Sequence, residues 1–315
     1  MFQSARVLHM PEPDLRYHVP VLLRPVLEAG RGARRAVDAT LGDGGHAAGL
    51  LSAGSEVLGI DRDPEAILIS RNRLGDGAIQ YLQAPYASVE ALEAVARFQP
   101  DFILLDLGVS SRQLDQESRG FTFRPGAPLD MRMGPGSENA AKLLNEAEAA
   151  SLQEIFREYG DERRARRLAS EIVRRRERRQ FSTSDDLVNA IRAALGSKTG
   201  PGDFARLFQA LRIAVNDELQ GLEEALPAFR DALKPGGRLS IITYHSGEDR
   251  LVKLAFREWA NGCVCPPGLP VCACGGHPLG RVDPRKPVLP DDRELETNPR
   301  ARSAKLRSFV VDGTV

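Results

Sequence analysis

Two carboxylates and a glycine-rich turn stand near the start of the chain in a spacing that suits a nucleotide-like ligand. An apolar run ends in Asp38 and is followed by the turn Gly42-x-Gly44-x-x-Ala47. Glycines in such a turn permit a tight bend and let the backbone approach a ligand at the N-terminus of a helix. A second apolar run ends in Asp61, at about the distance from the turn (roughly 20 residues) where a carboxylate reaches a ribose diol. Together these residues predict a cofactor that contains adenosine.

The position of the first acid indicates which cofactor this is. Asp38 lies four residues before Gly42, and the pattern acid-x-x-x-Gly-x-Gly is similar to the S-adenosylmethionine turn of class I methyltransferases. That ligand has no pyrophosphate, but it carries an α-amino group and a sulfonium that an acid can face. The later turn 233–237, Leu-Lys-Pro-Gly-Gly, resembles the one that these enzymes place before their fifth strand. A nicotinamide-dependent dehydrogenase is the alternative, since it uses the same turn and ribose acid. The combined features favour S-adenosyl-L-methionine.

A third carboxylate, Asp106, ends the apolar run 101–107. Methyl transfer from a sulfonium needs a nucleophile held in line with the methyl group, so positioning does most of the catalysis. Enzymes that methylate exocyclic amines often have an acid or amide here, followed by two prolines and an aromatic residue. This chain keeps the acid and lacks the prolines and the aromatic residue. Asp106 is therefore the candidate to contact the cofactor or to accept a proton from an amino group. The alternative is a strand-end acid that caps a turn.

Alternating strands and helices must position these acids. Because such alternation is typical of a parallel sheet covered on both faces, the strand ends should meet at one ligand-binding edge. We therefore expect an α/β fold of the class I, Rossmann-like methyltransferase type. The predicted strands cover residues 36–41, 56–61, 78–83, 101–107 and 238–244, and the predicted helices cover residues 45–53, 64–74 and 87–98.

The fourth and fifth predicted strands are separated by far more residues than the dozen or so of an ordinary crossover. An inserted all-helical domain is the simplest explanation. Ser151 and Glu154 have the spacing of a capping box that would begin one of its helices, and residues 182–186 offer N-caps for another that ends at Leu195. The predicted division is a methyltransferase domain over 1–118, an inserted RNA-binding domain over 119–214, and the rest of the methyltransferase domain over 215–315.

The insert contains a one-sided run of positive charge. Residues 163–179 hold nine arginines against two glutamates. The plain interpretation is a solvated helix face, but arginine is the residue best suited to phosphate forks. We expect this segment to bind RNA phosphates, and the candidates are Arg175, Arg176, Arg178 and Arg179. A second basic cluster near the C-terminus comprises Arg300, Arg302, Lys305 and Arg307.

Composition narrows the choice of function only a little. The formal net charge is zero, so affinity for nucleic acid must come from local patches. No apolar run approaches the roughly 18 residues of a membrane span, and the N-terminus lacks an export signal. We therefore expect a cytoplasmic protein with no membrane association. The oligomeric state stays open, with a homodimer as one alternative.

Nearly the whole chain resembles the bacterial cytosine-N4 methyltransferases of small-subunit (16S) ribosomal RNA, the MraW or RsmH family. Two of the matching stretches are long and idiosyncratic, namely residues 208–219 and 298–307. The others are residues 17–23, 38–46, 59–63, 104–111, 120–124, 129–133 and 158–160.

The resemblance implies a site and a reaction. The acceptor would be N4 of a cytidine in the decoding region, which must be single-stranded or flipped to expose its amino group. A ribosome-binding assembly factor with a vestigial cofactor site is a further alternative, but the intact acids argue against it. The residues best placed to hold the base are Ser110, Ser111, Tyr244 and His245. The donor-site residues that the resemblance implies are Gly44, Gly45, His46, Asp61, Asp106, Gln113 and Tyr86, which stands where the family more often has phenylalanine.

All four cysteines fall in one late segment. They form two Cys-x-Cys pairs that could hold a tetrahedral zinc, although Cys-x₂-Cys is the commoner spacing. The alternative is a proline-rich loop that carries reduced thiols. Members of the resembled family commonly lack this cluster, so catalysis does not require it. The residues are Cys263, Cys265, Cys272 and Cys274.

Overall fold

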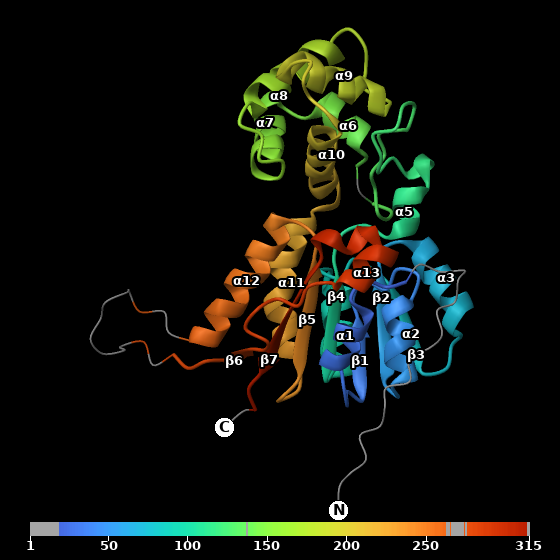
Figure 1. The fold of residues 1–315 in the computed structure, drawn as a ribbon, viewed down its shortest axis with the longest axis vertical. Helices are drawn as coiled ribbons and strands as arrows, with labels where there is room; N and C mark the ends of the chain where they lie inside the picture. The colour runs from blue at the N-terminus through green and yellow to red at the C-terminus, as the bar shows by residue number, and fades with distance from the viewer. Residues whose placement is uncertain (1–18, 137, 263–264, 266–273, 275, 314–315) are drawn as a thin grey trace, which may run out of the picture. The chain divides into compact units, whose positions relative to one another are not determined.

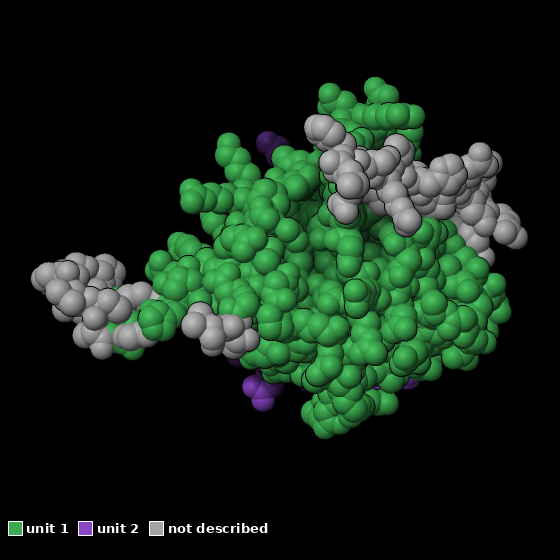
Figure 2. All heavy atoms as spheres, turned by 90° about the horizontal axis from the view of Figure 1, so that it is seen from below, with its two compact units in different colours: residues 1–108, 221–315 green, residues 109–220 purple. Residues whose placement is uncertain are grey.

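The computed structural model describes residues 19–136, 138–262, 265, 274 and 276–313. The chain divides into two compact units, one of residues 1–108 and 221–315 (unit 1) and one of residues 109–220 (unit 2) (Figure 2). No helix in the described part of the chain has the length and apolar character that a membrane span requires.

Unit 1 is built on a seven-stranded sheet in the order β3-β2-β1-β4-β5-β7-β6 (Figure 1). The first five strands are parallel, and β7 runs antiparallel between β5 and β6. All five predicted strands are present, although β1 ends earlier than expected because the chain leaves it for the glycine turn. The strands are β1 Arg35–Asp38, β2 Glu56–Asp61, β3 Ile79–Gln83, β4 Phe102–Asp106, β5 Arg238–Thr243, β6 Gly280–Val282 and β7 Lys305–Val311.

Helices cover both faces of this sheet (Figure 1). Successive strand residues alternate between two buried clusters, as the two-residue period of a strand requires. Val37 and Leu105 belong to one cluster, and Ala36 and Leu104 belong to the other. The predicted class I, Rossmann-like fold is therefore confirmed. The associated helices are α1 Leu23–Ala29, α2 Gly45–Ser52, α3 Pro64–Leu74, α4 Val89–Phe98, α11 Glu218–Ala232, α12 Ser246–Asn261, α13 Asp292–Thr297 and the 3₁₀ helix η2 Pro299–Ser303.

Unit 2 has helices around a core of its own, which includes Phe156, Leu168 and Leu211. The capping box expected at Ser151 is wrong: the helix begins earlier, at Ala149, and Ser151 lies inside it. The cap predicted within residues 182–186 is confirmed at Thr183. The described helices are α5 Ser111–Asp115, η1 Glu117–Arg119, α6 Ala140–Glu146, α7 Ala149–Glu158, α8 Ala165–Arg176, α9 Ser184–Leu195 and α10 Pro201–Asn216.

Candidate functional site

The glycine turn is held in place by the acid that ends β2. Gly42 and Gly44 have φ values of 52° and 74°, which glycine adopts without the penalty that a Cβ imposes. Oδ2 of Asp61 accepts a hydrogen bond from the Gly42 amide at 2.8 Å, and Oδ1 accepts one from the Asp63 amide at 2.8 Å. The sequence placed this acid near the turn as a ligand contact. The structure shows that its side chain also fixes the shape of the turn.

Asp38, at the end of β1, is a buried carboxyl whose second oxygen lacks a partner. Only 1% of the residue is exposed. Its Oδ1 accepts a long bond of 3.4 Å from the Thr40 amide, whereas Oδ2 is buried and has no hydrogen-bond partner in the described chain. Burial raises the pKa of this carboxyl from 3.8 to about 6, against the lowering effect of nearby His46. A buried carboxylate oxygen in this condition fits a cationic group of a ligand, such as the ammonium or sulfonium of S-adenosylmethionine.

Asp106, at the end of β4, has a neighbour on each carboxylate oxygen. The Tyr244 hydroxyl donates a hydrogen bond of 2.8 Å to its Oδ1. Nε2 of His46 lies 3.3 Å from its Oδ2. The backbone amide of Asp106 donates to Oγ1 of Thr40 at 2.6 Å. The structure thus joins three residues that the sequence nominated separately, and it ties the glycine turn to the end of β4.

The charges in this cluster shift the titration of both neighbours of Asp106. Burial lowers the pKa of His46, but the interaction with Asp106 and the charges of Asp38 and Glu294 outweigh it and leave the pKa raised. Burial raises the pKa of Tyr244 well above its ordinary value, and the adjacent Asp106 raises it further. Tyr244 therefore stays a hydroxyl donor at neutral pH.

His245 has a structural task that the sequence did not reveal. It is the N-cap of α12, where the Glu248 amide donates to its Nδ1 at 3.4 Å. Its Nε2 lies 3.0 Å from Oε1 of Glu248, which is 2% exposed. The same glutamate accepts the Tyr244 amide at 2.7 Å. The imidazole is therefore engaged in the cap, and its predicted contact with a base stays a prediction.

Other nominated residues lie in local structures of their own. The ring of Tyr86 packs against Phe229, with the ring centroids 6.3 Å apart. In unit 2, Ser110 is the N-cap of α5, and its hydroxyl accepts the Gln113 amide at 3.2 Å. The Gln113 side chain accepts the Ser110 amide at 3.0 Å, which completes a capping box. Ser111 is the first residue of α5.

The arginines of unit 2 divide into structural and exposed groups. Arg176 donates to the carbonyls of Leu144 and Ala147 at the end of α6, so it caps that helix. Arg175 shares Glu171 with Arg174, at 2.6 and 2.7 Å. Within residues 163–179, the exposed arginines whose side chains make no ion pair or hydrogen bond to the described residues are Arg163, Arg166, Arg167 and Arg178, and exposed Arg179 lies 4.0 Å from Asp186. In unit 1, Lys305 and Arg307 pair with Asp249 at 3.3 and 2.7 Å.

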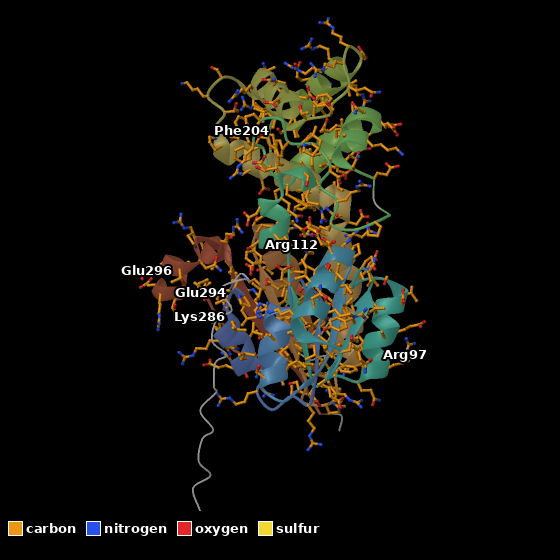
Figure 3. The ribbon with its side chains drawn as sticks, turned by 90° about the vertical axis from the view of Figure 1, so that its right-hand side faces the viewer. Arg97, Arg112, Phe204, Lys286, Glu294 and Glu296 are labelled. Carbon is orange, nitrogen blue, oxygen red and sulfur yellow. The ribbon has the colours of Figure 1, made fainter. Side chains whose placement is uncertain are left out.

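Unit 2 also contains a pocket of about 320 Å³, which no sequence pattern predicted. Its polar wall includes Arg212, whose guanidinium pairs with Glu218 at 2.8 Å. Phe123, another wall residue, contacts the ring of Phe204 on α10 at 5.9 Å between centroids; Figure 3 labels Phe204. The lining residues are Leu114, Phe121, Thr122, Phe123, Met131, Ala205, Phe208, Gln209 and Arg212.

The cysteine cluster is only partly within the described residues. Cys265 and Cys274 belong to them, whereas Cys263 and Cys272 lie outside. Among the side chains that the structure describes, no group of three or more histidine, cysteine or acidic residues is arranged to hold a metal. The zinc site over all four cysteines stays a prediction.

The buried carboxyl of Asp38 makes a testable contribution to stability. Its pKa is higher in the folded state than in the unfolded one, so its stabilising contribution is present below about pH 4 and is lost as the pH rises through about 6. At about 1.4 kcal/mol per pKa unit, burying the charge then costs about 3 kcal/mol. Asp38→Asn should therefore unfold at higher urea concentration than wild type above about pH 6, and the difference should shrink towards about pH 4. The control is Asp76→Asn, since the Asp76 side chain is 75% exposed. Parallel stability curves for Asp38→Asn and wild type would contradict this assignment.

Comparison with known proteins identifies the family of the chain. The sequence profile of the MraW methylase family matches residues 16–311. A protein of Gemmatimonas aurantiaca named ribosomal RNA small subunit methyltransferase H is 56% identical over 298 residues, which are 93% of this chain and 95% of that protein. A protein of the same name from Heliobacterium modesticaldum is 47% identical, over 93% of this chain and 97% of that protein. One from Rubrobacter xylanophilus is also 47% identical, over 92% of this chain and 94% of that protein. The chain belongs to the MraW methylase family.

Proposed function

We propose that this protein transfers a methyl group from S-adenosylmethionine to N4 of a cytidine in the decoding region of 16S ribosomal RNA. Family membership makes it a methylase with S-adenosylmethionine as donor, and its relatives are named as methyltransferases of small-subunit ribosomal RNA. The observation that carries the N4 assignment is the Asp106 carboxylate, which lies at the end of β4 with a hydrogen-bond donor on one oxygen and His46 on the other. A carboxylate is the group that can accept a hydrogen bond, and then a proton, from an amine.

The residues around the glycine turn suit the donor. S-adenosylmethionine supplies a methyl group on a positively charged sulfur. Asp38 would stabilise a cationic part of it, because its Oδ2 is buried without a partner. A carboxylate has about four acceptor positions, so Asp61 can bind ribose hydroxyls while it still accepts two backbone amides. Gly44 is the N-cap of α2 with a left-handed φ, so the turn leads directly into the N-terminus of that helix.

Chemistry at N4 needs a base rather than a covalent nucleophile. The N4 lone pair is delocalised into the ring, so the amine is a poor nucleophile until it pyramidalises. A hydrogen bond from N4–H to Asp106 favours that change, and the carboxylate can take the proton after transfer. Methylation at C5 normally needs a cysteine nucleophile. The cysteines of this chain all fall between residues 263 and 274 in sequence, and none belongs to β4 or β5 or directly follows either strand.

The exposed arginines of unit 2, which include Arg178, suit the RNA backbone better than Arg175 and Arg176, two residues that the sequence nominated and that protein groups engage. Arg166 and Arg167 lie in the first turn of α8, and Arg163 precedes its N-cap, Arg164. Arg178 follows the end of the helix, while Arg175 and Arg176 are already engaged by protein groups. A phosphate competes poorly for an arginine that caps a helix, so we assign phosphate binding to the exposed group. The aromatic pocket of unit 2 offers rings on which a base can stack.

Asp38→Asn should weaken S-adenosylmethionine binding at least tenfold at neutral pH, because a neutral amide replaces the buried carboxylate. In the wild type, affinity should fall as the pH drops through about 6, where Asp38 gains a proton, whereas affinity in the variant should depend little on pH. Titration calorimetry measures the affinity and its pH dependence, and Asp76→Asn serves as the matched control. Unchanged affinity in Asp38→Asn would remove Asp38 from the donor site.

Asp61→Ala should lose about 1–3 kcal/mol of the free energy of S-adenosylmethionine binding, measured by the same calorimetry.

The reaction is tested with purified small ribosomal subunits and labelled donor, followed by mass spectrometry of the nucleosides. We expect N4-methylcytidine, and we expect Asp106→Asn to reduce its rate of formation about 100-fold, the range for loss of a positioned base. Label at C5 of the ring would overturn the proposed chemistry. Full activity of Asp106→Asn would overturn the role of that carboxylate.

Replacing Arg163, Arg166, Arg167 and Arg178 by alanine should weaken RNA binding and spare donor binding. Loss of up to four phosphate contacts should reduce the slope of log affinity against log salt by up to about 3. The control removes four exposed arginines of unit 1 for the same change in net charge: Arg24, Arg71, Arg97 and Arg281. Figure 3 labels one of them, Arg97. Equal salt slopes in the two variants would show that α8 is not the phosphate-binding surface.

A further inference from the structure

Tyr244 lies in the site, but the proposed reaction assigns it no task. It directly follows β5, whose residue Ile242 pairs with Asp106 in the register of the sheet. Its ring packs against an apolar cluster of unit 1, its amide donates to Glu248, and its hydroxyl donates to Oδ1 of Asp106 at 2.8 Å. The side chain is therefore held along its whole length and directed at one oxygen of the carboxylate.

The other oxygen of Asp106 has a different neighbour. Nε2 of His46 lies 3.3 Å from Oδ2, and both nitrogens of the ring are buried with no hydrogen-bond partner in the described chain. The Asp106 side chain is 22% exposed, whereas His46 is 6% exposed. Asp106 is thus the member of the cluster that an acceptor base can reach, and His46 lies behind it in the interior.

We propose that Tyr244 is a positioning residue that occupies Oδ1 of Asp106, so that Oδ2 receives the N4 proton and His46 then shares it. This inference rests on the proposed function. When N4 loses its proton, the electron pair of the N–H bond stays on nitrogen and the proton binds Oδ2. A carboxylate oxygen that already accepts a strong hydrogen bond is the less basic of the two, so Oδ2, whose neighbour is the His46 ring, takes the proton.

The charges and protonation of the groups around Asp106 support these separate roles for its two oxygens. The pKa of Tyr244 is raised well above its ordinary value, first by burial and then by Asp106, so the phenol remains a donor through the neutral range. The pKa of His46 is raised too, because Asp106, Asp38 and Glu294 together outweigh burial. The titratable groups around Asp106 are Tyr244 after β5, His46 on α2, Asp38 on β1, Asp61 on β2, Glu248 on α12 and Glu294 on α13. Figure 3 labels Glu294.

The test compares Tyr244→Phe with Tyr81→Phe. The first variant removes only the hydroxyl that Asp106 accepts. The second removes a hydroxyl of β3 that donates to the Gly75 carbonyl at 2.6 Å. Single-turnover rates with small subunits are measured across pH, together with calorimetric affinity for S-adenosylmethionine and thermal melting. For Tyr244→Phe we expect a rate loss of about 10- to 100-fold and donor affinity within about twofold of wild type.

The pH dependence separates positioning from a structural role. Loss of the phenol leaves Asp106 to interact more strongly with His46, so the pH–rate profile should move to higher pH. In the free enzyme, the NMR titration of the His46 ring should also move to higher pH, since the stronger base stabilises imidazolium. Tyr81→Phe should leave both curves in place.

Each contrary outcome has a distinct meaning. If Tyr244→Phe keeps the wild-type rate and pH profile, Tyr244 does not position Asp106. If it loses rate and melting temperature together while the pH profile and the His46 titration stay fixed, its role is only structural, and the proposal fails. Failure of the wild-type enzyme to form N4-methylcytidine refutes the proposed function instead. The His46 titration needs no substrate, so it tests the Tyr244–Asp106–His46 coupling even then.

Discussion

Strands β1 and β4 lie side by side in the sheet, in a register that pairs Asp38 with Leu104. The strand order reverses between them, because β2 and β3 extend the sheet on one side and β5 on the other. At such a reversal the connections leave in opposite directions and open a crevice at the carboxyl ends of the strands. Asp38 and Asp106 end these two strands, so the pairing brings both carboxyl groups to one place. Every other feature of the candidate site is arranged around that pair.

The carboxyl groups of the candidate site are negatively charged groups held out of water, and this burial lowers the stability of the fold. The effect is clearest at Asp38, since burial raises its pKa to about 6 and leaves one oxygen without a hydrogen-bond partner in the described chain. Removing that charge should stabilise the free protein and weaken donor binding. The same atom thus opposes stability and favours function, as is common where a site is prepared for a charged ligand.

Unit 2 shows that a run of like charge is not a uniform surface. Arg176 satisfies carbonyls at the end of α6, and Arg174 and Arg175 share Glu171. Arginine serves both purposes because its planar fork binds carbonyls and carboxylates as readily as phosphates. Only the members of the run that face solvent remain for RNA. Their identity follows from which neighbours pack against α8, and not from the density of charge along the chain.

Local sequence determined much of this protein. Apolar runs that end in Asp38, Asp61 and Asp106, with a glycine turn after the first, were sufficient for the strands and the class of fold, because these signals depend on neighbours within a few residues. Contacts between distant parts of the chain were decided only by tertiary structure. Tyr244 and Asp106 are 138 residues apart in sequence and meet because β5 pairs with β4. The cap that engages Arg176 lies about 30 residues away on another helix. No periodicity or spacing encodes such partners, since they depend on strand order and helix packing, which the whole chain settles together.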